Sequence, residues 1–255
     1  MMSKPLAHDA AFFYNRTGRL RNKTKVILFL SVLAILFLCA AAVRLIAATA
    51  ERRAAASVRV GTPTLVIDAG HGGFDGGAIS DDGTRESDIN LAVALRLESI
   101  VRFCGQKTVM TRWDDSRKTD ILSYSEREDL RQRAELANRT ENAVLISIHQ
   151  NSFPTAQLKG AQVLYSSFGN SEKLGKRIQE QLVTRLDPEN RRLAAPAPSD
   201  LYLTSNARCP AVLVECGFMS NNFEVLKLKE NGYQNALALV IAASYLEYIS
   251  DNDLL

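Results

Sequence analysis

The stretch Thr64-Leu-Val-Ile-Asp-Ala-Gly-His-Gly-Gly73 decides how this chain folds. Its first half, Thr64 to Asp68, is a short run rich in β-branched residues, which predicts a buried strand. The run ends in Ala-Gly-His-Gly-Gly, whose glycines predict a loop directly after the strand. A continuous apolar strand is typical of a parallel sheet covered on both faces. We therefore expect an α/β fold with His71 at the carboxyl end of its first strand.

The rest of the chain alternates short apolar runs with longer amphipathic segments. Strands are expected at 107–111, 143–148, 161–166 and 211–215, and helices at 87–103, 125–138, 171–186 and 233–249. Ser87 is expected to cap the first of these helices, and Ser125 with Glu128 forms a capping-box pattern at the second. This alternation predicts a largely parallel sheet with helices on both faces, and it places the chemistry in the loops at the strand ends.

The composition is that of a globular protein. Of the 255 residues, 46% are hydrophobic and 23% are charged, and the formal net charge is +3. Without a clustered basic face beyond residue 60, so small a charge gives no reason to expect a nucleic-acid partner. Cys39 lies in the apolar N-terminal run, and Cys104, Cys209 and Cys216 have neither CxxC spacing nor an even count. No disulfide framework is therefore expected.

Residues 26–48 are expected to form one N-terminal transmembrane helix. Val26 to Val43 carries no charge and is long enough to span a bilayer. Basic residues in the tail 1–25 place that tail in the cytoplasm and the rest of the chain outside. A cleaved signal peptide, from which the protein would be secreted, is the alternative, because Ala48-Thr49-Ala50 fits a cleavage pattern. The apolar run exceeds the usual length of about 7–15 residues for a signal peptide, which favours a retained anchor.

Downstream of the apolar segment the sequence has two histidines, His71 and His149, and each follows a predicted strand. Carboxyl ends of parallel strands meet in one crevice, so the two side chains could converge there. Two unrelated loop residues are the alternative. Glu215 ends an apolar strand and needs a cation, a hydrogen-bond network or solvent to compensate its burial. Glu86 stands near a helix start, where the helix dipole alone favours an acidic residue.

Two neutral imidazoles and one carboxylate are a recurring ligand set for catalytic zinc, and a further carboxylate can act as the base. Glu215 is the candidate base. A Ser-His-Asp triad is disfavoured, because the chain has no GxSxG, and HExxH, GxxxxGK[ST] and GxGxxG are also missing. Cys216 could be a nucleophile, but a cysteine on a buried strand is more often an apolar filler.

Four separated motifs carry a resemblance to a known family. They are Asp68-Ala-Gly-His-Gly-Gly73, Glu86 before Asp88-Ile-Asn-Leu91, Ser147-Ile-His-Gln-Asn151, and Leu213-Val-Glu-Cys-Gly-Phe218 with Ser220-Asn221. In this order, over residues 63 to about 249, they strongly resemble the N-acetylmuramoyl-L-alanine amidases with a zinc-dependent amidase-3 domain. Gly160-Ala-Gln-Val, the compact length and the single anchor look most like the sporulation branch, which acts on spore-cortex peptidoglycan.

The resemblance implies a three-layer α/β/α domain with a mixed, mainly parallel sheet over residues 63–250, preceded by a linker at 49–62. It implies that His71, Glu86 and His149 bind Zn²⁺ and that Glu215 is the catalytic carboxylate. The reaction would be hydrolysis of the bond between N-acetylmuramic acid and L-alanine in peptidoglycan. One departure is Ser87, where many relatives have Lys, so any ion pair made by that Lys is missing.

The resemblance also has implications outside the catalytic residues. The domain would lie outside the cytoplasm, in the cell wall or the forespore intermembrane space, anchored by residues 26–48. The helix that blocks the zinc in some cell-division relatives has no counterpart between His149 and Glu215. Because no separate peptidoglycan-binding domain is recognised, the anchor or a regulatory partner protein is expected to provide localisation. A zinc peptidase of the stem peptide and an inactive glycan-binding relative are the alternative functions.

Overall fold

The structure is a computed structural model, and it describes residues 62–115 and 125–251 together with Leu30, Ala40 and Arg44. The chain divides into two units, residues 1–58 and 59–255, and the fold below is that of the second. Apart from those three residues, the tail, the expected membrane segment at 26–48 and nearly all of the linker at 49–62 lie outside the described part. No helix among the described residues has the length and apolar character needed to cross a bilayer.

A six-stranded sheet forms the centre of the domain, with the strand order β2-β1-β3-β6-β4-β5. The strands are β1 Thr64–Ala69, β2 Lys107–Met110, β3 Ala143–Asn151, β4 Gln162–Tyr165, β5 Ala195–Pro196 and β6 Ala211–Phe218. All neighbouring pairs are parallel except β4 and β6, which are antiparallel. The prediction of a mixed, mainly parallel sheet is confirmed.

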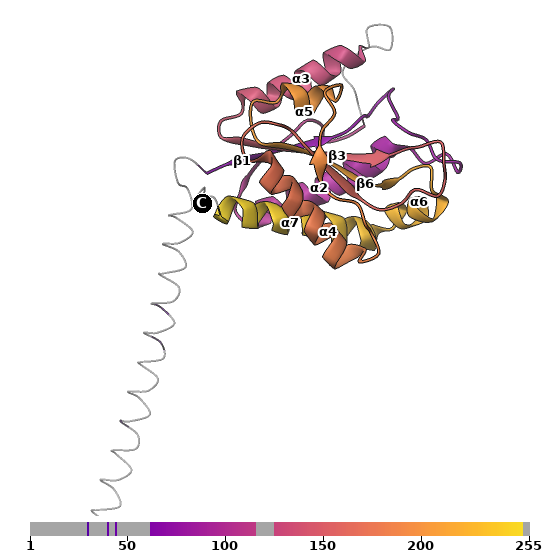
Figure 1. Cartoon of the computed structure of the whole chain (residues 1–255). Helices are drawn as coiled ribbons and strands as arrows, with labels where there is room; N and C mark the ends of the chain where they lie inside the picture. The colour runs from indigo at the N-terminus through magenta and orange to yellow at the C-terminus, as the bar shows by residue number, and fades with distance from the viewer. Residues whose placement is uncertain (1–29, 31–39, 41–43, 45–61, 116–124, 252–255) are drawn as a thin grey trace, which may run out of the picture. The chain divides into compact units, whose positions relative to one another are not determined.

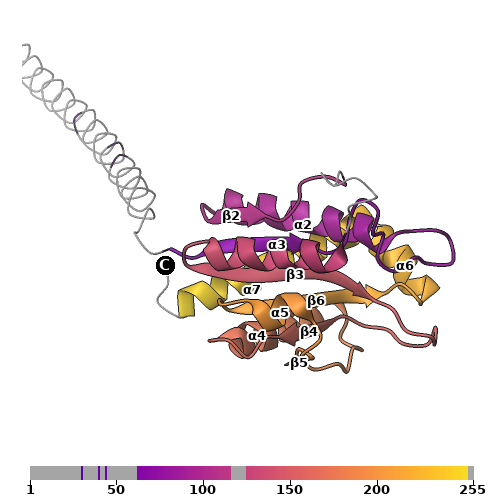
Figure 2. The ribbon, with the colours of Figure 1, turned by 90° about the horizontal axis from the view of Figure 1, so that it is seen from above.

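Helices cover both faces of this sheet. They are α2 Glu86–Phe103, α3 Glu126–Arg139, α4 Ser171–Leu186, α5 Tyr202–Asn206, α6 Asn222–Lys229 and α7 Asn231–Asp251. In Figure 1, α3 and α5 lie on one face of the sheet, and α2, α4 and α7 lie on the other. Figure 2 shows α3 and α5 from above, lying over the strands. The three-layer α/β/α architecture is thereby confirmed.

The apolar run of β1 is continuous because both of its faces are buried. Leu65 and Ile67 belong to the larger core cluster, which they share with side chains of α2, α4 and α7. Val66 points the other way, into a smaller cluster that includes Ala134 of α3 and Leu203 of α5. All three β1 side chains are fully buried. A strand between two helical layers therefore needs apolar residues at successive positions.

One prediction about helix ends was wrong. Ser87 does not cap α2, because the helix begins at Glu86 and Arg85 occupies the N-cap position without a side-chain cap. The N–H groups of Glu86 and Ser87 donate instead to the carbonyls of Ala78 and Gly76, at 2.9 and 3.0 Å. The loop after β1 thus satisfies the first turn of α2. At α3 the predicted cap by Ser125 is present, since its hydroxyl accepts from the Glu128 N–H, whereas the Glu128 carboxylate bonds Arg131 instead of completing a capping box.

The topology defines one crevice at the carboxyl ends of β1 and β3. From β1 the chain passes through α2 to β2 at one edge, whereas from β3 it passes to β4 on the far side of β6. The chain therefore leaves neighbouring strands in opposite directions, and loops separate at this point. Next to it, His149 of β3 pairs in register with Glu215 of β6.

Candidate metal centre

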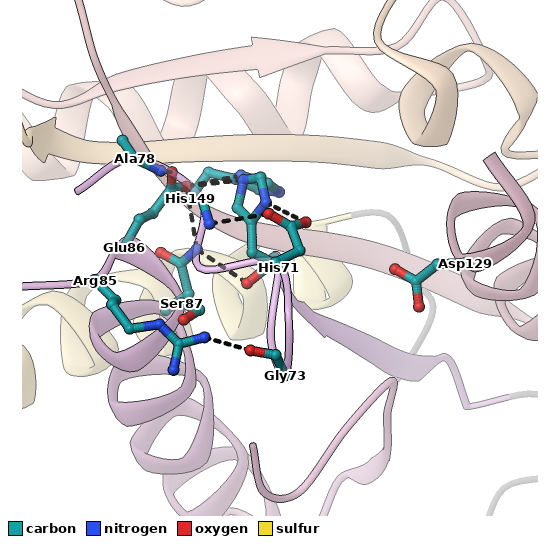
Figure 3. Close-up of polar contacts among 12 residues, drawn as sticks. His71, Gly73, Ala78, Arg85, Glu86, Ser87, Asp129 and His149 are labelled. Atoms are coloured by element: carbon teal, nitrogen blue, oxygen red, sulfur yellow. Dashed lines mark hydrogen bonds and ion pairs between the residues drawn. The ribbon is translucent and has the colours of Figure 1, made fainter. Parts of the chain in front are cut away.

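Three predicted ligands meet in the crevice. His71 comes from the loop after β1, Glu86 is the first residue of α2, and His149 lies near the end of β3. One potential ligand atom from each lies within 4.8 Å of the others. Glu86 Oε1 is 3.0 Å from His149 Nδ1 and 3.4 Å from His71 Nε2, and Figure 3 shows the two rings turned toward this carboxylate.

The Glu86 carboxylate is buried and rigidly held. Its Oε1 accepts from the Gln150 N–H at 3.0 Å and from Asn90 Nδ2 at 3.2 Å, and its Oε2 accepts from the Ala78 N–H at 2.9 Å. Burial alone would raise the pKa of Glu86, but its contacts with the two histidines outweigh burial and hold the pKa well below its ordinary range. Glu86 is therefore an anionic group with a fixed orientation, as a metal ligand must be.

Asp75 orients the His71 ring, a role that the sequence analysis missed. Asp75 Oδ2 lies 2.7 Å from His71 Nδ1, which leaves Nε2 facing Glu86. Burial lowers the pKa of His71, but its bonds to Asp75 and Glu86 outweigh burial and raise it to about 10. A carboxylate on the outer nitrogen of a ligand histidine selects the tautomer and increases its basicity. The signal was present in the sequence, four residues after His71.

Two glycines of the loop are required by the site itself. A Cβ at Gly70 would lie 2.2 Å from His149 Nε2. At Gly77, which has φ +67°, a Cβ would lie 2.6 Å from Glu86 Oε2 and 2.7 Å from His71 Cδ2. Real Cβ atoms do not approach other atoms so closely, so neither position can carry a Cβ while the ligand side chains keep these places. The Gly-rich loop is therefore shaped by the three ligand side chains as well as by the turn.

Glu215 lies beside the three ligand residues, in a different environment. It faces the same cleft, and its Oε2 has no hydrogen-bond partner among the described residues. Burial raises the pKa of Glu215 to about 7. A carboxyl group with that pKa, free of hydrogen bonds on one oxygen, can take up and release a proton near neutral pH.

The cleft extends from this cluster toward α3 and α5. Its volume is about 300 Å³, and its walls include Glu126 and Asp129 of α3 and Tyr202 of α5. Leu213 and Glu215 of β6 contribute to its lining. The volume is at the lower end of the range for ligand sites, which spans roughly 300–1,000 Å³.

The chemistry of the donor set fits zinc. Two imidazole nitrogens and one carboxylate oxygen are a known catalytic zinc set, which leaves a coordination position open. Hydrogen bonds from the two backbone amides at 78 and 150 orient the carboxylate. The assignment of His71, Glu86 and His149 as ligands and of Glu215 as the base stays a prediction, and the structure places all four at one site.

The thiol alternative loses its basis in the structure. Cys216 is 1% exposed, and burial raises its pKa to about 12. A thiol in this state is a poor nucleophile, because only the thiolate attacks. Among the described residues, Cys104, Cys209 and Cys216 are free, in agreement with the expectation of no disulfide framework.

Known proteins are similar to this chain in both sequence and fold. The germination-specific N-acetylmuramoyl-L-alanine amidase of Bacillus subtilis is 37% identical over 195 residues, which cover 73% of this chain and 80% of the relative. A structure of the CwlD amidase from Clostridioides difficile, in complex with the GerS lipoprotein, matches with a TM-score of 0.67 and 35% identity over 73% of this chain and 98% of that chain.

A second structure and a family model agree with these relatives. The catalytic domain of CwlV, an N-acetylmuramoyl-L-alanine amidase from Bacillus (Paenibacillus) polymyxa var. colistinus, matches with a TM-score of 0.62 and 29% identity over 74% of this chain and 98% of that domain. The Amidase_3 family, described as N-acetylmuramoyl-L-alanine amidase, matches residues 65–246. That range holds all of the sheet except its first residue, Thr64, and all four residues of the site. The chain belongs to the Amidase_3 family of N-acetylmuramoyl-L-alanine amidases and is an enzyme that acts on peptidoglycan.

Proposed function

We propose that this amidase uses zinc, held by His71, Glu86 and His149, to hydrolyse the bond between N-acetylmuramic acid and L-alanine during maturation of the spore cortex. One observation carries the proposal. A preoriented set of two imidazoles and a carboxylate lies beside Glu215, a second carboxylate that has one unpartnered oxygen and a raised pKa. The similarity to the germination-specific amidase of Bacillus subtilis supports the spore-related role.

Glu215 carries the proton transfers in this proposal. When bound, zinc polarises the amide carbonyl and acidifies water in its open coordination position. As the water oxygen bonds to the lactyl carbonyl carbon, Glu215 accepts the water's proton. The carbon–nitrogen bond then breaks, and Glu215 returns the proton to the departing nitrogen of L-alanine. The products are a free lactyl carboxyl group and a stem peptide with a free amino terminus.

The products formed from purified peptidoglycan test the reaction. Wild-type protein loaded with zinc should release intact stem peptides, identified by mass spectrometry. Chelator-treated protein should release them only after zinc is restored. Shortened peptides would indicate the zinc peptidase instead, and no product would indicate a glycan-binding protein without turnover. Glu215→Gln serves as the control for contaminating amidase.

The spore-cortex assignment needs a separate comparison. Peptidoglycan from spores and from vegetative cells of the same organism should be digested in parallel. We expect faster release of stem peptide from the substrate of the sporulating cell. Equal rates on both substrates would argue against a cortex preference and leave the amidase reaction intact.

We further propose that a regulatory partner protein acts on this enzyme. The solved complex of the CwlD amidase with a lipoprotein supports this proposal. An extract of exported proteins should raise the specific activity of the purified enzyme, and the heated extract should not. No change with either extract would count against a partner.

The proposed location is the outer side of a membrane, with residues 26–48 as the anchor. The support is the long uncharged run and its basic flank in the sequence. Full-length protein should stay with membranes after a carbonate wash, whereas a chain that starts near Val60 should not. Mature protein beginning near Glu51 would show instead that the segment is cleaved and the enzyme secreted.

A further inference from the structure

Three consecutive backbone carbonyls at the end of β1 and in the loop that follows are held by two arginine side chains. Arg133 donates to the carbonyl of Ala69 at 2.9 Å and to that of His71 at 2.9 Å. Arg112 donates to the carbonyls of Ala69 and Gly70, at 2.8 and 3.2 Å. We call these two arginines, with the carbonyls of residues 69–71, the carbonyl clamp.

Each arginine also ties this loop to another part of the domain. Arg133 projects from α3 and pairs with buried Asp68 at 2.8 Å, and its own side chain is only 8% exposed. Arg112 follows β2 and donates to the carbonyl of Ser87 at 2.7 Å. Ser87 directly follows Glu86 in the first turn of α2. The clamp therefore joins the loop that carries His71 to the helix start that carries Glu86.

The backbone of this loop needs such support. His71 has φ +60°, in the left-handed region that side-chain-bearing residues rarely adopt, and Gly72 and Gly73 follow with φ +128° and +60°. A strained backbone persists only where surrounding contacts over-determine it. The loop also folds closely over one clamp residue, because a Cβ at Gly72 would lie 2.8 Å from Arg112 Nε.

We propose that Arg112 and Arg133 are positioning residues of the metal centre, which hold His71 and Glu86 in ligand geometry before the metal binds. The inference rests on the proposed zinc dependence. Neither arginine is proposed to contact the reacting atoms, because the N–H groups named above donate to backbone carbonyls and to Asp68. Removal of the clamp should therefore lower metal affinity first, and turnover only through the metal.

The test replaces the guanidinium fork and keeps its charge. Lysine presents one compact ammonium group and cannot bond several carbonyls in a plane, so Arg133→Lys and Arg112→Lys each break part of the clamp. Arg131→Lys is the matched control. Arg131 lies on the same helix as Arg133, is exposed, and pairs with Glu128 and Glu135 of that helix. The full-length protein is purified in detergent, and its zinc affinity is measured by competition with a chromogenic chelator.

We expect Arg133→Lys and Arg112→Lys to bind zinc about 10- to 100-fold more weakly than wild type, the usual effect of losing a residue that supports a ligand. Arg131→Lys should match wild type. At saturating zinc both clamp variants should recover kcat, with KM for peptidoglycan unchanged. Amide hydrogen exchange at residues 71–73 of the metal-free protein should become faster in the clamp variants and stay the same in the control.

The outcomes separate this inference from the proposed function. Zinc affinity equal to that of Arg131→Lys would overturn it, whatever the amidase activity. A raised KM with unchanged zinc affinity would also overturn it, because the arginines would then contact substrate. If wild-type protein bound no zinc, the proposed function would fail, and so would the role of the two arginines in metal binding. Hydrogen exchange at residues 71–73 would then still show whether the arginines hold the loop. If Arg133→Lys does not fold, Arg112→Lys decides by the same measurements.

Discussion

Gly70 is the position where the smallest change should have the largest effect on the metal centre. The Cβ of Gly70→Ala would lie 2.2 Å from His149 Nε2, 2.3 Å from Cε1 and 2.7 Å from Cδ2. Ordinary non-bonded contacts of carbon are about 3.5–4.0 Å, so the ring must withdraw by about 1 Å or more. Zinc–nitrogen distances tolerate only about 0.2 Å of variation. The added methyl group should therefore remove His149 from the ligand set.

The effect on folding should be much smaller than the effect on zinc. The His149 side chain is 20% exposed and borders the cleft, so its ring has space into which it can move. Overpacking of an interior costs roughly 1–3 kcal/mol, and we expect the low end of that range here. Zinc affinity should fall by more than about 100-fold, the upper limit for loss of a supporting residue, because a ligand itself is displaced. Chelator competition and urea unfolding measure the two quantities.

Gly232→Ala is the matched control, since a Cβ at that position meets no atom within 4 Å. It should leave zinc affinity unchanged. His149→Ala should lose zinc to the same extent as Gly70→Ala, without the overpacking. If Gly70→Ala retained wild-type zinc affinity and stayed folded, the close approach of Gly70 to His149 would be wrong, and the geometry of the metal centre with it.

Three further predictions concern the carboxylates. Glu215→Gln should keep zinc and lose about 10²-fold or more in turnover. Glu86→Gln should lose zinc together with activity, and excess zinc should restore part of the activity. The reverse pattern would exchange the roles of base and ligand. Burial raises the pKa of Glu215 to about 7, and a bound cation would lower it. Because the base must be ionised, kcat/KM should fall with decreasing pH, with a midpoint between the ordinary value of 4.5 and about 7. A flat pH profile at constant zinc content would contradict this. Burial acts to raise the pKa of Asp68, but Arg133 outweighs burial and lowers the pKa from 3.8 to about 2. The ionised carboxylate therefore stabilises the folded state by about 2 kcal/mol above pH 4, and this stabilisation is lost as the pH falls through 2. Asp68→Asn should therefore strongly lower the urea midpoint of unfolding at pH 7. Glu172→Gln, which removes an exposed ion pair, is the control, and an equally small change in Asp68→Asn would contradict the argument.

The sequence was sufficient for the parts of the fold that depend on local patterns. Apolar runs between turn residues located β1, β3 and β6, and helical periodicity located α2, α3, α4 and α7, within a few residues at most ends. The strand ends were less predictable, because β3 continues to Asn151 and β6 to Phe218, each three residues past its predicted end. Pairing between these two strands, with a register shift after His149, holds polar residues in extended structure there. Sequence periodicity does not report such pairing.

Short elements and long-range polar contacts were missed for the same reason. The strand β5 has two residues and the helix α5 has five, and neither length supports a periodic pattern. Ser87 was expected as a cap because serine is a good capping residue, yet carbonyls of the preceding loop satisfy the helix start. Arg133 looked like an ordinary residue on a charged helix. Its contacts with the β1 loop span more than 60 positions in sequence, and only the fold brings them together.

The two carboxylates of the site illustrate how environment assigns a role to a residue type. Glu86 is buried and Glu215 is half-buried at the same crevice, and burial acts to raise the pKa of each, although the histidines reverse this effect at Glu86. Glu86 receives two backbone N–H bonds and faces both histidines, so it stays ionised and suits a permanent ligand. Glu215 has an oxygen without a partner, so it suits a group that must gain and lose a proton within one turnover. Since the two glutamates are chemically identical, the difference between ligand and base comes from their surroundings: both histidines contact Glu86 and hold its pKa down, and the backbone amides of residues 78 and 150 fix its orientation.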